Sequence, residues 1–152
     1  MLAVATRFAR ALAERDVATL SDLYAPEVGG VLAPPTIEVG GARAPWLPVP
    51  RETLIAFHEQ MAQHFARSPM VTQREPRSVR SFRECLRRSC PSGLLGPGEW
   101  LVEWGSVNAL HSGTVAAGVM PWSLRISDGP DGPRVVGVTD EVIVAALRRR
   151  RP

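Results

Sequence analysis

The stretch RDVATLSDLYAPEV, residues 15–28, directs the first part of the fold. Asp16 is of a type that caps helix N-termini, and the apolar residues after it recur at helical spacing. Pro26 and the glycines that follow it end this helix. Residues 2–15 also have apolar side chains at steps of three and four; these are Leu2, Ala5, Phe8, Ala9 and Leu12. The sequence therefore predicts two consecutive helices.

Proline and glycine interrupt the next segment. Residues 31–50 contain five prolines and two glycines, so we expect a long loop there with a short strand at residues 36–39. Pro50 suits the first position of a helix, because its missing N–H donor is not needed there. We expect this third helix to run from Pro50 to about Arg67.

From residue 70 onward the pattern is typical of strands, which are predicted at residues 70–73, 79–82, 100–110, 115–126 and 134–144. The sequence DGPDGP at residues 128–133 is a strong turn signal. Helices followed by consecutive strands indicate an α+β domain rather than a doubly wound sheet. The length of 152 residues fits one domain, expected at residues 1–147 with a basic tail at residues 148–152.

The positive charge is unevenly placed. All 18 basic residues are arginine, against 15 acidic residues, which gives a formal net charge of +3. Four arginines form the run at residues 148–151, and six more lie between Arg74 and Arg88. A nucleic-acid site would place several aromatic side chains among the arginines, and this cluster has only Phe82. The sequence therefore argues against nucleic-acid binding, and the charge is expected to be a solvated surface.

Two cysteines, Cys85 and Cys90, are too few for a disulfide framework or a four-ligand zinc site, so we expect reduced thiols and no metal. No stretch approaches the roughly 20 apolar residues of a membrane span. The sequence thus predicts a cytoplasmic protein without a cofactor and without membrane contact.

The predicted order is two helices, a loop, a third helix opened by proline, and then antiparallel strands. Within it, the most specific pieces are LYAPEV at residues 23–28 and DGPRVVGVTDEV at residues 131–142. Together they resemble the SnoaL-like members of the nuclear transport factor 2-like (NTF2-like) superfamily, over about residues 2 to 146. The resemblance implies a cone-shaped, curved, mostly antiparallel sheet wrapped by three helices from the N-terminal half and enclosing an apolar pocket. It also implies a homodimer formed through the sheet. Relatives include polyketide cyclases, ketosteroid isomerase, scytalone dehydratase and limonene epoxide hydrolase, so the fold alone does not fix the chemistry.

Two catalytic arrangements of these relatives have no counterpart in this chain. The isomerase and the epoxide hydrolase carry polar groups on the strand after the LYAP-type motif, where residues 29–33 read GGVLA. The arginine–aspartate pair of the epoxide hydrolase corresponds in approximate register to Trp104 and Ser106. Neither mechanism transfers directly.

The resemblance leaves one acidic residue of the last strand in place, Asp140. Strand alternation puts it on the same face as Val138 and Val142, where apolar neighbours would raise the pKa of its carboxyl group toward that of a general acid or base. The alternative is an edge carboxylate that faces solvent or pairs with Arg134.

Two histidines are candidate partners of Asp140. His58 lies in the apolar stripe of the third helix, where it is either a core histidine or a pocket group paired with the carboxylate. His111 lies near a strand end and could face the pocket mouth. Glu103 is either a pocket carboxylate or a group on the dimer face.

A bulky apolar ligand is favoured by four tryptophans in a chain of this length. Tyr24, the sole tyrosine, either donates to a substrate oxyanion or packs between helix and sheet. The predicted substrate-binding residues are Tyr24, Trp46, Met61, Phe65, Trp100, Trp104, Asn108 and Trp122.

The resemblance and these residues together predict a small enzyme of secondary metabolism that needs no cofactor. It would catalyse acid–base cyclisation, isomerisation, dehydration or epoxide opening on a hydrophobic polyketide- or terpenoid-like substrate. Asp140 would move the proton, and His58 or His111 would assist. The alternative is a non-catalytic module of the same fold that binds a small ligand or dimerises.

Overall fold

The computed structural model describes residues 1–26, 30–32, 46–47, 49–64, 70–72, 76, 78–87, 94–104, 107–111, 114–116 and 122–139. Its helices are α1 (Leu2–Glu14), α2 (Val17–Leu23), α3 (Arg51–His64) and α4 (Phe82–Arg87). Its strands are β1 (Gly30–Leu32), β2 (Trp46–Leu47), β3 (Met70–Thr72), β4 (Ser78–Ser81), β5 (Glu99–Trp104), β6 (Val107–His111), β7 (Thr114–Ala116), β8 (Trp122–Gly129) and β9 (Gly132–Thr139).

The turn between α1 and α2 confirms the predicted helix boundary. The Asp16 side chain accepts hydrogen bonds from the backbone N–H of Thr19 at 3.0 Å and from its hydroxyl at 2.6 Å. These bonds, the hydroxyl bond first, lower the pKa of the Asp16 carboxyl group below its ordinary value. Arg15, just before it, has φ +58° and ends α1 in the left-handed conformation. The two helices are therefore joined by a tight, capped turn.

Replacing Arg15 with glycine should stabilise the protein by about 1 kcal/mol, because glycine adopts the left-handed conformation without steric cost. The Nε and Nη2 atoms of Arg15 are buried without a hydrogen-bond partner, so none is lost with them. Urea unfolding measures the change. Arg7→Gly, an exposed position inside α1, is the matched control and should destabilise by about 1 kcal/mol. Equal losses for both variants would contradict the role given to the Arg15 backbone.

The third predicted helix is present as α3, which begins at Arg51 immediately after Pro50. The Pro50 carbonyl accepts hydrogen bonds from the N–H groups of Thr53 at 3.0 Å and Leu54 at 3.3 Å, so Pro50 flanks the first turn. The expected extension to Arg67 and the strand at residues 36–39 lie outside the described residues.

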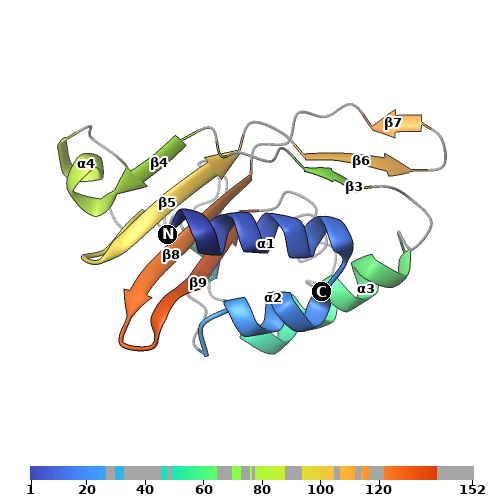
Figure 1. The fold of residues 1–152 in the computed structure, drawn as a ribbon, viewed down its shortest axis with the longest axis horizontal. Helices are drawn as coiled ribbons and strands as arrows, with labels where there is room; N and C mark the ends of the chain where they lie inside the picture. Colours follow the sequence, from blue (N-terminus) through green and yellow to red (C-terminus); the bar gives the residue numbers. More distant parts are fainter. Residues whose placement is uncertain are drawn as a thin grey trace.

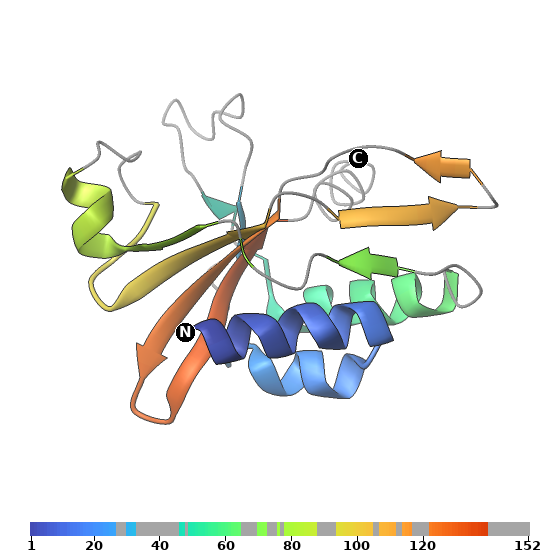
Figure 2. The same cartoon turned by 45° about the horizontal axis from the view of Figure 1, so that its top comes forward.

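Six strands form one sheet in the order β2-β1-β9-β8-β5-β4, in which the β1–β9 pair is parallel and the other pairs are antiparallel. Figures 1 and 2 show this sheet curling beside α1 and α2, with α3 next to α2. The predicted class, an α+β fold with a curved, mostly antiparallel sheet and three helices from the N-terminal half, is confirmed.

The strands predicted at residues 100–110 and 115–126 are each wrong in extent. The first divides into β5 and β6, and the second contains β7 and the start of β8. β6 and β7 join β3 in a separate sheet of order β3-β6-β7, which Figure 2 shows apart from the larger sheet. The chain therefore changes sheets after Trp104 rather than continuing one long strand.

The main core lies between the helices and one side of the large sheet, which we call the helix-facing side. Leu124 and Ile126 of β8 and Val135 and Val138 of β9 are buried there against Phe8 of α1. The predicted turn at residues 128–133 joins β8 to β9, with Gly132 at φ +90°. A register shift between Arg125 and Ile126 marks a bulge in this pair.

The other side of the sheet, which we call the outer side, carries charged cross-strand contacts. Glu103 of β5 accepts a hydrogen bond from the Ser78 hydroxyl at 2.5 Å and pairs with Arg80 of β4. Glu99 lies 3.6 Å from Arg125 of β8. Of the two positions considered for Glu103, the structure thus places it outside the helix-facing core.

Helix α4 was not predicted, and it divides the described part of the arginine cluster. Arg80 lies on β4, whereas Arg83 and Arg87 are exposed on α4. Cys85 of this helix is buried in a small cluster with Leu94, Leu95 and Leu101.

The expectation of reduced thiols is wrong, because Cys85 is disulfide-bonded. The only other cysteine in the sequence is Cys90, which lies outside the described residues. In the described ranges, no helix is long and apolar enough to cross a bilayer.

Candidate functional site

Tyr24 and His58 form a hydrogen-bonded pair in the main core. Tyr24 follows α2 directly, its backbone N–H bonds to the Leu20 carbonyl at 3.2 Å, and it bridges to Val135 of β9. His58 lies in α3, and its Nε2 atom is 2.8 Å from the Tyr24 hydroxyl oxygen. The two side chains come from positions 34 residues apart, so the packing of α2, α3 and β9 creates the pair.

Aromatic rings enclose this pair. Phe8 meets the Tyr24 ring edge-on at a centroid distance of 5.5 Å and the His58 ring at 6.3 Å. Phe57 packs edge-on against His58 at 6.0 Å. Tyr24 is 2% exposed and His58 is 4% exposed, so the hydroxyl–imidazole bond is shielded from solvent.

Burial determines the protonation state of His58. Loss of solvation lowers the pKa of the imidazole from its ordinary 6.5 to about 4, which leaves the ring neutral at neutral pH. A neutral imidazole has one N–H donor and one acceptor nitrogen, so it can accept the Tyr24 proton or donate to the Tyr24 oxygen. The hydrogen bond between Tyr24 and His58 can therefore run in either direction, according to the tautomer of the neutral ring.

The side chains of the other predicted catalytic residues, Asp140 and His111, are not described. Asp140 lies outside the described residues, as does Phe65. His111 and Asn108 are on β6, in the smaller sheet, where they face Thr114 and Val71 in the strand register. Their side chains, like that of Met61 in α3, are not described.

Two of the predicted tryptophans are brought into register. Trp104 of β5 is the direct cross-strand partner of Trp122 of β8. Trp100 pairs with Ile126 on the helix-facing side and is half-buried. Trp46 lies on β2 opposite Leu32. Trp100, Trp104 and Trp122 thus lie on adjacent strands of the large sheet.

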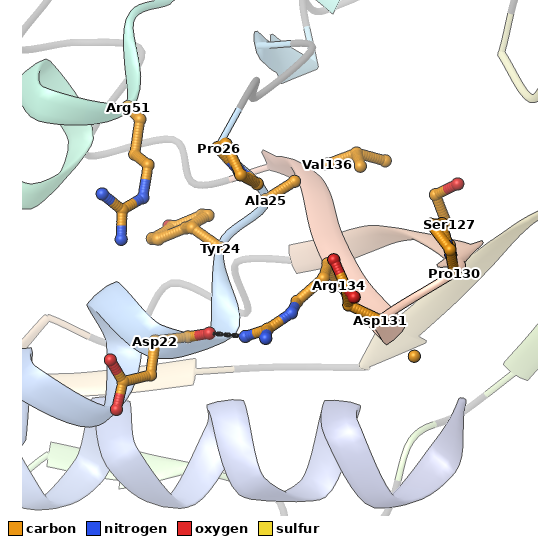
Figure 3. A pocket seen from close by; sticks show the side chains of 12 residues that line it. Asp22, Tyr24, Ala25, Pro26, Arg51, Ser127, Pro130, Asp131, Arg134 and Val136 are labelled. Carbon is orange, nitrogen blue, oxygen red and sulfur yellow. Dashed lines mark hydrogen bonds between the residues drawn. The ribbon is translucent and has the colours of Figure 1, made fainter.

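A cavity of about 450 Å³ opens near the end of α2, and Tyr24 is among the described residues that line it. Figure 3 shows Arg51 and Tyr24 on one side and Arg134, Asp131 and Ser127 of the β8–β9 hairpin on the other. Neither arginine was predicted as a site residue, because no motif marks either one. Only the folded chain brings Arg51 of α3 and Arg134 of β9 to the same helix end.

Both arginines cap α2. The Nη2 atom of Arg51 donates to the Ser21 carbonyl at 2.6 Å and to the Ser21 hydroxyl at 2.9 Å. The Nη1 atom of Arg134 donates to the Asp22 carbonyl, as the dashed line in Figure 3 marks. These donors satisfy carbonyls that the end of a helix leaves without an intrahelical partner, and their charge complements the helix dipole.

Comparison with known proteins supports the fold through structure rather than sequence. No protein-family model matches the sequence, and no curated protein matches it. A candidate dehydratase of the NTF2-like family from Streptomyces avermitilis matches with a TM-score of 0.57 at 14% identity, covering 90% of this chain and 88% of that one. The β subunit of benzoate 1,2-dioxygenase from Burkholderia mallei has a TM-score of 0.57 at 13% identity, covering 90% and 84%.

An NTF2-like protein of unknown function from Pseudomonas putida has a TM-score of 0.56 at 14% identity, covering 90% of this chain and 79% of that chain. With the sheet order and the three helices above, these similarities define the class: this chain has the NTF2-like fold. Proteins of this fold include enzymes such as dehydratases as well as proteins of unknown function.

Proposed function

We propose that the protein is a small enzyme that needs no cofactor and catalyses proton transfer on a hydrophobic small molecule. The reaction class is cyclisation, isomerisation, dehydration or epoxide opening of a polyketide- or terpenoid-like substrate. The observation that supports this proposal most is the 2.8 Å bond between the Tyr24 hydroxyl and the neutral imidazole of His58 in an aromatic environment. A low-dielectric surrounding strengthens such polar contacts and excludes water from a reactive intermediate.

In this proposal Asp140 takes a proton from the carbon next to a substrate carbonyl, and the carbonyl oxygen receives a proton as the enol forms. Asp140 then gives its proton to another carbon of the enol, and the enol O–H proton returns to the group that donated it, so the carbonyl is restored and the isomerisation is complete. The hydroxyl of Tyr24, hydrogen-bonded to His58, donates the proton to the carbonyl oxygen and later takes it back. His111, on β6, assists. The tryptophans at positions 46, 100, 104 and 122, with Met61, Phe65 and Asn108, hold the substrate in a reactive conformation.

Proton exchange tests the reaction class without knowledge of the natural substrate. The protein is incubated in D2O with a panel of hydrophobic enones and β-diketones, and deuterium incorporation is followed by mass spectrometry. We expect exchange well above the buffer rate for at least one compound. If the folded protein causes no exchange above the buffer rate for any compound in the panel, the result would count against the proposed enzyme activity.

Replacing Asp140 with asparagine should reduce this exchange by at least about 100-fold, because the amide cannot accept the proton and general acid–base catalysis contributes roughly 10²–10⁴-fold. Val138, two residues earlier on β9, is buried on the helix-facing side, which supports a position of Asp140 toward the core. Asp131→Asn, on the exposed hairpin turn, is the matched control and should leave exchange unchanged. Full activity of the Asp140 variant would remove that residue from the mechanism.

A non-catalytic ligand-binding module is the second candidate, and one observation favours it. Tyr24 and His58 are 2% and 4% exposed, and Phe8 and Phe57 pack against the imidazole, so a substrate reaches the pair only if these rings shift. Saturable binding of an apolar ligand without any proton exchange would support this candidate.

We also propose a homodimer formed through the outer side of the sheet. The half-buried Arg80–Glu103 pair and the nearby Glu99–Arg125 pair give this side a charged pattern that a second copy can match. Sedimentation at low and high salt tests this assembly, since a dimer held by such pairs should weaken as salt increases.

A further inference from the structure

The cavity at the end of α2 combines apolar walls with fixed cationic groups. Its apolar surface comes from Ala25, Pro26, Pro130 and Val136, which belong to two separate segments of the chain. Its volume of about 450 Å³ lies within the usual range of small-molecule sites. The cavity is distinct from the Tyr24–His58 hydrogen bond, although the Tyr24 residue borders both.

The two guanidinium groups at this cavity are held in place by backbone carbonyls. Arg51 donates through Nη2 to Ser21, and Arg134 donates through Nη1 to the Asp22 carbonyl. In Figure 3 they approach the end of α2 from opposite sides of Tyr24. Each guanidinium carries more N–H donors than these bonds use, and an immobilised donor loses little entropy when it binds an acceptor.

No carboxylate among the described residues forms an ion pair with either arginine. Asp22 and Asp131 also line the cavity, yet neither is within salt-bridge distance of Arg51 or Arg134. Figure 3 shows the Asp22 carboxylate turned away from Arg134, which binds the backbone oxygen of that residue instead. Asp131 is exposed on the hairpin turn.

From this combination we propose that the cavity binds a small organic acid. Its carboxylate accepts hydrogen bonds from the free N–H groups of Arg51 and Arg134, and its apolar body lies along Pro26, Pro130 and Val136. Bidentate arginine–carboxylate contacts supply geometric specificity, and the proline and valine side chains supply apolar area. The groups that would bind the acid are Arg51 and Arg134, neither of which has a role in the proposed catalysis, although Tyr24 borders this cavity as well.

Titration with 4-phenylbutyrate tests the site, and 4-phenylbutyramide, an uncharged analogue of the same shape, serves as the control ligand. Tyr24 is the only tyrosine, so selective tyrosine labelling gives one ring signal that reports binding at the cavity by NMR. We expect the acid to shift this signal and to bind at least about tenfold more tightly than the amide, since hydrogen bonds to charged groups contribute more than neutral ones. Equal affinity of acid and amide, or no saturable shift with the acid, would overturn the proposal.

Arg51→Gln and Arg134→Gln should each weaken binding of the acid at least about tenfold and leave the amide unaffected. Arg87→Gln, at an exposed arginine of α4, is the matched control and should bind normally.

The two arginine substitutions also remove caps of α2. A third variant, Gly129→Leu, therefore keeps both arginines and adds a side chain at a residue that lines the cavity. A Cβ atom at Gly129 meets only the Gly132 carbonyl, at an ordinary 3.7 Å, so this change is tolerated locally. Binding that survives Gly129→Leu and both arginine substitutions would place the acid elsewhere and overturn the assignment. Proton exchange is measured on the same variants and should remain, which separates failure of this site from failure of the proposed enzyme.

Discussion

Acidification from about pH 7 to about pH 4 should lower the free energy of unfolding by about 3 kcal/mol through His58 alone. The imidazole has a pKa of about 4 in the folded protein and 6.5 when exposed, so the unfolded chain binds the proton first. The contribution of His58 is therefore fully present above pH 6.5 and is lost as the pH falls toward 4. Urea unfolding at several pH values measures this loss.

The variant His58→Gln isolates the effect, because the other titrating groups remain in place. The wild type should lose about 3 kcal/mol more than this variant over the same pH interval. If the two proteins lose stability in parallel, the imidazole is not held neutral by burial. His64 and His111 are present in both proteins and cancel in the comparison.

Tyr24→Phe should destabilise the protein by about 1–3 kcal/mol, because it removes the hydroxyl and leaves a buried nitrogen of His58 without that partner. His58→Leu should carry a cost of similar origin. The double variant should cost less than the two single changes together, since no polar group of the pair is then left buried alone. Chemical denaturation of the four proteins gives the coupling energy, and strictly additive losses would show that Tyr24 and His58 do not interact.

Local signals predicted much of the fold. Asp16 predicted the start of α2, Pro50 predicted the start of α3, and DGPDGP predicted the β8–β9 turn, because each acts on its neighbours through capping, ring geometry or turn preference. The division of the long strands depends instead on pairing between distant segments. Glu99–Trp104 pairs with β8, whereas Val107–His111 pairs with β3, and nothing within residues 100–110 marks the change of partner.

Helix α4 was missed for a related reason. The segment FRECLR is too short for helical periodicity to be recognised, and Cys85 is buried only because Leu94, Leu95 and Leu101 meet it in the folded chain.

The sequence predicted that Tyr24 and His58 belong to the candidate site, but it did not predict how they are arranged. The apolar stripe of α3 indicated His58, and the LYAP-type motif indicated Tyr24, but their bond joins residues 34 positions apart. Arg51 and Arg134 are separated still further, and their shared role at the end of α2 arises from tertiary packing. The type of a residue marks it as a candidate for the site, whereas tertiary packing determines which other residue it contacts.

The bond between a neutral His58 and Tyr24 is the central claim, and ¹⁵N NMR of the imidazole tests it most directly. A pH titration of the wild type, with His58→Gln to assign the signals, should show a neutral His58 ring from pH 7 down through pH 5, with its midpoint at about 4. In Tyr24→Phe the Nε2 signal should shift, because its hydrogen-bond partner is gone. A His58 titration midpoint near the ordinary 6.5, together with an Nε2 signal that is unchanged in Tyr24→Phe, would contradict the hydrogen-bonded pair and the function proposed from it.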